Sequence, residues 1–551
     1  MSVSVGWIDP PKYKNGLDPL GVQQPCIAMY SALLPGITNV TDRIAYYGFG
    51  PWFVRVFAQR NPEATANEFV QMLRRAEVLF TLLGIRHALM HPESPFEEHA
   101  GALVGVDTLR APVEQARANA VIRPSSYALL EQSPMRYFKN RRGGLGQYYL
   151  GVLREEYLLL DDRKDRVIDF TFERGLPMAE AVSRGVDGGL FFRCLESDRA
   201  TLSDLDTLAS FCPCQLRART RSPERELLLD TVLGRQADLS ENPVARRNSL
   251  ALIIDFLRLG AGCRISLGPP DDFLVACYSR TLPNGMKWSP SESLFSACDG
   301  WAFYLRGELF SVAMQRLFRE ALLTLEGMPS RILPNVEEAA RQCASSTTFK
   351  EAARRLSATT YDRLLAKAAA ALPSLGELSD SRHEIDIWQR VVQDPESPSD
   401  GVEAAARLLL GLVSRHQAAE DKTEPVTVTS TLRLDHYPIN TNSIMARART
   451  RWPGMKLSAW MTDVVTWVLA THRQVALRKL SQSGDDTRRL LMGDEGLYVG
   501  GEIIKVARTL PRLGPALRFL RDLGLVNRAQ PGCLPIPTPE ALRFLAQAGN
   551  E

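Results

Sequence analysis

Residues 510–550 read LPRLGPALRFLRDLGLVNRAQPGCLPIPTPEALRFLAQAGN, and they carry the clearest local pattern in this 551-residue chain. Apolar residues recur at helical spacing from Leu510 to Leu523, which predicts a short amphipathic helix. Gly524 stands where a residue in the left-handed conformation would end that helix.

A hairpin and a second helix are predicted after this stop. Short strands are indicated at 525–526 and around 534–536. Thr538 followed by Pro539 has the N-cap and first-turn chemistry of a helix start. The order helix, hairpin, helix predicts a winged-helix-like module over about 502–551, and many such modules bind nucleic acid.

The C-terminal part of the chain is also its basic part. From Ala446 to Glu551 there are 16 Lys and Arg against 9 Asp and Glu, whereas the whole chain carries a net charge of only +3. This asymmetry is typical of a phosphate-facing end, although solvated arginine-rich helix faces are equally common. The predicted nucleic-acid-binding residues are Lys505, Arg508, Arg512, Arg518, Arg521 and Arg528.

Most of the remaining chain is predicted to be helical, which makes the fold class mainly α with a few short strands. Apolar periodicity predicts an aromatic-rich helix after Thr41 and helices over 64–83, 249–259, 301–325, 402–416 and 457–480. The alanine-rich stretch 336–372 predicts a helical hairpin, 379–401 a surface connection, and the alternating stretch 426–434 a strand.

Four domains are predicted from shifts in composition. They are an aromatic-rich helical domain at 1–160, a central helical domain at 161–330, alanine-rich helical hairpins at 331–425, and a basic C-terminal domain at 426–551. The hydrophobic content of 45% and charged content of 23% are those of a soluble globular protein. Without an apolar segment of about 18 residues or a signal peptide, the chain is expected in the cytoplasm, away from any membrane.

Histidine and cysteine groups offer two incomplete metal-binding patterns. His87 and His91 have the spacing of ligands on one helix face, but Pro92 predicts that the helix ends there. Cys212 and Cys214 lack a second cysteine pair nearby in the sequence. Taken separately, neither pattern supports a metal site, so no metal and no cofactor are expected.

A glycine-rich stretch and an arginine run offer possible anion contacts. Arg141, Arg142, Gly143 and Gly144 precede a predicted helix whose N-terminal amides are suited to a phosphate. A tight turn that allows close helix packing is the alternative. The run Arg217, Arg219, Arg221 and Arg225 predicts either a solvated surface or a contact with nucleic acid or a partner.

Two stretches resemble segments of known proteins. LLPGITNVT at 33–41, leading into Tyr46 and Tyr47, and GGLGQYY at 143–149 resemble uncharacterised bacterial proteins encoded beside antiphage defence genes. Trp301 with its long helix, and the closing winged-helix-like segment, stand where that pattern would place them. The resemblance implies a bacterial component of a multi-gene system, and it supplies no catalytic residues.

The sequence therefore predicts a non-enzymatic, nucleic-acid-contacting component of a bacterial multi-protein system, with a role in antiphage defence. DNA or RNA and other protein subunits are the expected partners. The first alternative is an assembly scaffold whose winged helix binds protein alone. The second is an enzyme with an unrecognised site, for which the histidines and glutamates of 87–99 are the candidates.

Overall fold

The computed structural model is mainly helical and divides into two compact units. It describes residues 18–117, 119–129, 140–162, 168–234, 241–328, 333–419, 434–484, 486–494, 496–528 and 530–550. Unit 1 contains Met1–Leu33, Ser266–Pro290 and Phe295–Leu510, and unit 2 contains Leu34–Ile265, Ser291–Leu294 and Pro511–Glu551. Each unit combines segments from several of the four predicted domains, because segments far apart in the sequence share one core. Within the described ranges, no helix combines the length and apolarity needed to cross a membrane.

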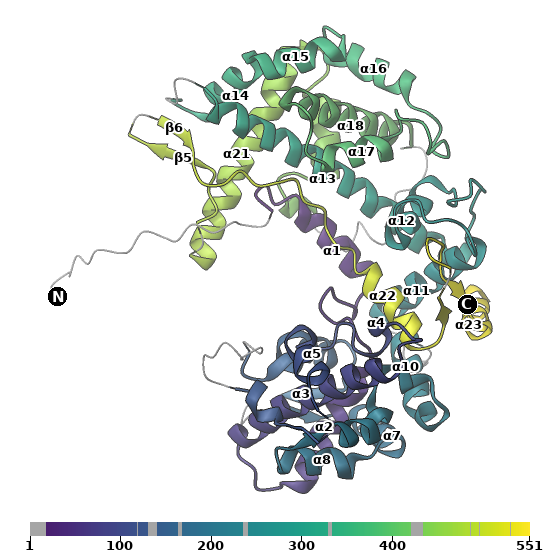
Figure 1. Cartoon of the computed structure of the whole chain (residues 1–551). Coiled ribbons are helices and arrows are strands. Elements are labelled where there is room, and N and C mark those ends of the chain that lie inside the picture. The colour runs from purple at the N-terminus through teal and green to yellow at the C-terminus, as the bar shows by residue number, and fades with distance from the viewer. Residues whose placement is uncertain are drawn as a thin grey trace, which may run out of the picture. The chain divides into compact units, whose positions relative to one another are not determined.

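Unit 1 is built around the long helix α13 (Phe295–Glu326), which packs against α1, α12, α17 and α18 (Figure 1). Apolar side chains occur on nearly every face of α13, as expected for a helix surrounded by neighbours. Its other elements are α1 (Gln23–Leu33), α12 (Pro269–Ser279), α14 (Val336–Ser345), α15 (Thr347–Leu356), α16 (Tyr361–Ala371), α17 (Glu384–Val392), α18 (Pro398–Ala419), η7 (Leu434–His436), α20 (Thr441–Thr450), α21 (Leu457–Ser483) and the antiparallel strands β5 (Leu490–Gly493) and β6 (Gly496–Val499).

Two predictions for this part of the chain are wrong. The hairpin expected at 336–372 consists of three helices, α14 to α16. The surface connection expected at 379–401 contains α17, whose apolar side chains, Trp388 among them, are buried where the helix packs on α18. The strand expected at 426–434 lies outside the described residues, apart from Leu434 at the start of η7.

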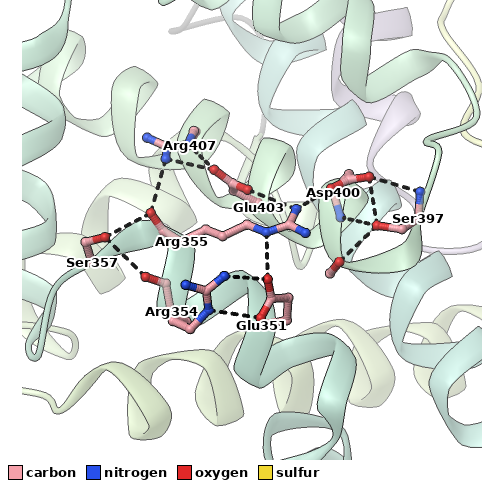
Figure 2. A network of polar contacts seen from close by, with 9 residues as sticks. Glu351, Arg354, Arg355, Ser357, Ser397, Asp400, Glu403 and Arg407 are labelled. Carbon is pink, nitrogen blue, oxygen red and sulfur yellow. Dashed lines mark hydrogen bonds and ion pairs between the residues drawn. The ribbon is translucent and has the colours of Figure 1, made fainter.

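Helices α15 and α18 are joined by a network of charged side chains (Figure 2). Arg355 on α15 forms ion pairs with Glu351 on its own helix and with Asp400 and Glu403 on α18. Glu403 also accepts hydrogen bonds from Arg407, and Ser397 donates to Asp400 at 2.7 Å. The network holds the two helices together through charged side chains that are partly exposed.

Unit 2 is centred on the aromatic-rich helix α2 (Ala45–Arg60), which packs against α7 (Figure 1). The Thr65 and Glu68 capping box starts the next helix, α3 (Ala66–Met90). The other helices are α4 (Phe96–His99), α5 (Val106–Glu114), α6 (Leu150–Glu155), α7 (Gly175–Gly185), α8 (Gly188–Glu196), α9 (Leu202–Thr207), α10 (Ser222–Leu233), α11 (Glu241–Leu259), α22 (Leu513–Asp522) and α23 (Pro539–Asn550).

Short helical turns and two-stranded ladders complete unit 2. The turns are η1 (Pro124–Tyr127), η2 (Leu145–Tyr149), η3 (Leu208–Phe211), η4 (Pro213–Arg217), η5 (Arg219–Arg221) and η6 (Glu292–Leu294). The antiparallel ladders pair β1 (Val121–Ile122) with β4 (Ala200–Thr201), β2 (Leu160–Asp162) with β3 (Ile168–Phe170), and β7 (Val526–Asn527) with β8 (Ile536–Pro537).

The C-terminal segment has the predicted order of helix, hairpin and helix. Gly524 follows α22 with a φ of +72°, and Thr538 accepts a hydrogen bond from the Ala541 amide at the start of α23. The Phe519 ring of α22 packs edge-on against Tyr47 of α2, at 5.4 Å between centroids, and α23 packs against α11. The local prediction is confirmed, whereas the assignment to the winged-helix class remains a prediction.

Candidate nucleic-acid interface and histidine–cysteine cluster

The six predicted nucleic-acid-binding residues belong to two different units. Lys505 and Arg508 lie in unit 1, where Lys505 pairs with Asp394 at 3.0 Å and Arg508 pairs with Asp271. The Arg508 guanidinium also lies 4.2 Å from the centroid of the Trp388 ring. Both basic groups therefore have partners within unit 1.

The other four predicted residues belong to unit 2, and three of them surround one end of α22. Arg512 precedes the helix in the left-handed conformation, with a φ of +63°. The remaining three form a group with Arg217 of η4. For Arg217 the sequence predicts either a solvated surface or a contact with nucleic acid or a partner. We refer to Arg217, Arg518, Arg521 and Arg528 as the α22 arginine surface.

Carboxylates are shared among these arginines. Glu98 of α4 accepts a hydrogen bond from Arg217 at 3.3 Å through one oxygen and pairs with Arg528 at 3.1 Å through the other. Arg518 has its nearest carboxylate, Asp42, at 3.9 Å. Among the residues that the structure describes, the buried Nε of Arg521 has no hydrogen-bond partner.

Positive charge accumulates at this end of α22 as a result. Burial lowers the pKa of Arg521, and the neighbouring charges of Arg528 and Arg518 lower it further. Including the buried Arg43, five guanidinium groups share three carboxylates, those of Asp42, Glu98 and Asp522. This described set has a surplus of two positive charges.

Arg43 is a buried side chain that links α4 to α22. Its side chain is fully buried, and it donates to the carbonyl oxygens of Glu97, Glu98 and Gly101, which hold α4 in place. Its Nε lies 3.1 Å from a carboxylate oxygen of Asp522 on α22. Burial nevertheless raises the pKa of Asp522.

Two members of the arginine run at 217–225 have internal partners. Arg221 is buried, pairs with Glu224 at 2.6 Å and donates to the Cys212 carbonyl. Arg225 donates to the Leu523 carbonyl and pairs with Glu540 on α23. These two side chains have structural roles, whereas Arg219 is exposed and Arg217 joins the surface.

The glycine-rich phosphate candidate uses its amides inside the protein. The N–H groups of Gly144 and Leu145 donate to the carboxyl group of Glu77, which is buried on α3. Arg142 pairs with Asp162, and Arg141 donates to Asn67. Gly143 has a φ of +67°, and a Cβ atom there would collide with Glu77. These contacts give the glycines a structural role, in agreement with the tight-turn alternative.

A cluster of two histidines and two cysteines lies beside the arginine surface in unit 2. His87 comes from the last turn of α3 and His99 from the end of α4. Cys212 lies between η3 and η4, and Cys214 lies within η4. His87, His99 and Cys212 are buried, and Cys214 is partly buried. One donor atom from each residue lies within 4.8 Å of all the others.

The four donor atoms converge on one point. The two Nδ1 atoms are 2.8 Å apart and the two Sγ atoms 3.4 Å apart. Cys212 Sγ lies 3.6 Å from Nδ1 of His99, and Cys214 Sγ lies 3.4 Å from Nδ1 of His87. Hydrogen bonds from Cys212 and His87 lower the pKa of the Cys214 thiol, whereas burial raises that of Cys212.

Each half of this cluster is visible in the sequence by itself. The spacing of His87 and His91 is that of ligands on one helix face, but α3 ends at Met90, and the exposed His91 forms a hydrogen bond with Glu93. The correct partner is His99, which the turn after Pro92 and helix α4 bring back to α3. In the sequence, the histidines and the cysteines appear as two separate groups. Only the fold brings them together.

Comparison with known proteins gives no relative. No family model, no curated protein and no solved structure matches the chain. The resemblance to proteins encoded beside antiphage defence genes therefore remains a prediction.

Proposed function

We propose that this protein contacts the phosphate groups of DNA or RNA through the α22 arginine surface. In this proposal it has no catalytic activity of its own and works as one component of a bacterial multi-protein system, such as one for antiphage defence. The observation that carries the proposal is the surplus of guanidinium groups over carboxylates at one end of α22.

The state of the individual side chains supports a phosphate ligand. The side chains of Arg217, Arg518 and Arg528 are 35%, 35% and 43% exposed, so their guanidinium groups are accessible. Glu98 can satisfy only part of the hydrogen-bonding capacity of the two arginines that share it. A phosphodiester would accept further bonds from these planar groups and reduce their mutual repulsion.

Binding of labelled DNA and RNA at several salt concentrations tests the proposal. Fluorescence anisotropy should show binding that weakens as salt rises, since each neutralised phosphate of a duplex adds about 0.9 to the slope of log affinity against log salt. The double variant R217A/R528A should reduce this slope by about 1 to 2.

The matched control is R341A/R354A, which removes two exposed arginines from unit 1. This variant should bind as the unaltered protein does. Equal losses in both double variants, or no salt-dependent binding at all, would overturn the proposal. In the second case, the alternative of a scaffold that binds protein alone would be favoured.

A further inference from the structure

We propose that His87, His99, Cys212 and Cys214 bind a single Zn²⁺ ion as a structural centre of unit 2. Two imidazole nitrogens and two thiolate sulfurs form one of the standard ligand sets for tetrahedral zinc. The inference concerns a different set of atoms from the arginine surface and does not depend on the proposed contact with nucleic acid.

The spacing of the donor atoms fits one small ion. Zinc lies about 2.0–2.1 Å from nitrogen and about 2.3 Å from sulfur, so a tetrahedral site has edges of about 3.3 Å between nitrogens and about 3.8 Å between sulfurs. The corresponding separations of 2.8 and 3.4 Å are slightly shorter, and the mixed separations of 3.4 and 3.6 Å match such a site. Expansion by a few tenths of an ångström would accommodate the ion.

The same spacing excludes a two-iron cluster. A cluster held by two histidines and two cysteines attaches the histidines to one iron and the cysteines to the other. The nitrogen and sulfur ligands would then be separated by the whole cluster. Here each cysteine sulfur lies within 3.6 Å of a histidine nitrogen, so one ion must bind all four donors.

A bound cation would also explain how these nitrogen and sulfur atoms can lie so close together in a largely buried site. Two Nδ1 atoms that face each other need a proton between them, because two lone pairs repel and two N–H groups collide. Zinc instead accepts a lone pair from both nitrogens. It also balances two thiolates, whose negative charge would otherwise be costly in a site that is largely buried.

The surrounding structure holds the four ligands in place. Gly84 on α3 allows α4 to approach, since a Cβ atom at this position would lie 2.6 Å from Leu103 and 3.2 Å from the His99 carbonyl oxygen. Arg43 binds three carbonyl oxygens around α4, and Arg221 binds that of Cys212. Gln215 donates a hydrogen bond to the Cys214 sulfur at 3.5 Å. Such supporting contacts are the usual second layer of a zinc site.

The proposed role is structural because the four protein ligands fill the tetrahedral shell. A catalytic zinc site keeps one position for water or substrate. The ion would tie the turn between α3 and α4 to the turn between η3 and η4. His99 follows Glu98 directly and Cys214 precedes Arg217 by three residues, so the centre also supports the arginine surface.

Metal analysis of the full-length protein tests this inference. Inductively coupled plasma mass spectrometry should find about one zinc per chain in the unaltered protein, as expected for one four-ligand site. Replacement by Co²⁺ should give the visible absorption of a tetrahedral ion and a sulfur-to-cobalt charge-transfer band. The double variant C212S/C214S should lose both the zinc and the charge-transfer band.

Two matched controls separate the site from nearby sequence features. H91A removes the histidine that the sequence pairs with His87, and C533S removes a partly buried cysteine elsewhere in unit 2. Both controls should keep their zinc. The opposing outcome is a protein without zinc, in which the four side chains form only a hydrogen-bonded cluster. The proposal fails if unaltered protein from zinc-supplemented cultures contains no zinc, and that measurement does not require any variant to fold.

Discussion

The two arginine-rich regions of the molecule differ in how their charges are balanced. In the network between α15 and α18, three arginines meet three carboxylates, those of Glu351, Asp400 and Glu403 (Figure 2). At the end of α22, five arginines share three carboxylates. Only the second region therefore has unmatched positive charge.

This difference suggests a rule for interpreting arginine clusters. Where every guanidinium has a carboxylate, the cluster holds helices together, and a phosphate would have to displace an existing partner. Where the guanidinium groups outnumber the carboxylates, as at the end of α22, a phosphate can be added without such displacement. Counting partners therefore separates a structural network from a candidate binding surface better than counting basic residues.

The largest effect is expected from Arg43→Met. This change leaves the Asp522 carboxyl group and the carbonyl oxygens around α4 without their buried partner, which should destabilise unit 2 by about 3–5 kcal/mol. Chemical denaturation, followed by tryptophan fluorescence, can measure the loss. Arg355→Met in the α15–α18 network should cost much less, because Arg355 is 34% exposed and solvent screens its ion pairs. Equal losses would remove the distinction between the two regions.

Removal of the proposed zinc should produce the next largest effect. At a zinc concentration 100-fold above the dissociation constant, binding stabilises the fold by about 2.7 kcal/mol. A chelator should then lower the melting temperature of unit 2 by about 5–10 °C. Hydrogen exchange should accelerate at α4 and η4 while α15 and α18 keep their protection. Faster exchange in both regions would contradict a local role for the ion.

Glu77 in unit 2 and Glu351 in the α15–α18 network should contribute to the pH dependence of stability in opposite directions. Burial raises the pKa of Glu77 to about 8. Its folded form holds a proton that the unfolded form releases above about pH 4.5, so this contribution to stability is lost as pH rises toward 8. Hydrogen bonds from Arg354 and Arg355 lower the pKa of Glu351 to about 2, so its contribution is lost only as pH falls below about 4.5 toward 2.

Denaturation midpoints between pH 5 and 8 measure the first of these effects. The contribution of Glu77 to stability should fall across this range, with a slope of at most about 1.4 kcal/mol per pH unit. Glu77→Gln should flatten the curve, whereas Glu351→Gln should leave its slope unchanged over the same range. A Glu77→Gln curve parallel to that of the unaltered protein would show that Glu77 is already ionised.

The smallest effect is expected from Arg354→Ala at the edge of the balanced network. The side chain is 73% exposed, and its ion pair with Glu351 lies one turn away on the same helix. The loss of stability should be close to the error of the measurement, because solvent screens this exposed ion pair. Binding of nucleic acid should not change. A larger loss, measured by chemical denaturation, would show that the network depends on this outer arginine.

Features that depend on neighbouring residues in the sequence were predicted well. The stop at Gly524 and the N-cap at Thr538 both depend on residues within one turn of each other. The helix α17 was missed because Ser379–Gly401 is rich in polar and proline residues, which outweighed the few apolar side chains that α18 buries.

The candidate sites depend on contacts across long sequence separations. Cys212 reaches His99 across 113 positions, and Cys214 reaches His87 across 127. The charge balance of α22 likewise depends on Asp42, Arg43 and Glu98, which the local count of basic residues could not include. No local pattern specifies such partners, so each site appears in the sequence only as separate halves.

The interleaved order of the chain has a consequence for its synthesis. Unit 2 begins at Leu34, but its last segment starts at Pro511, and Arg225 donates to a carbonyl oxygen 298 residues further along. While the ribosome makes unit 1, the earlier part of unit 2 has emerged without α22 and α23. Throughout this period Arg43 lacks its partner Asp522. Nascent chains should therefore be a preferred target for chaperones until translation is nearly complete.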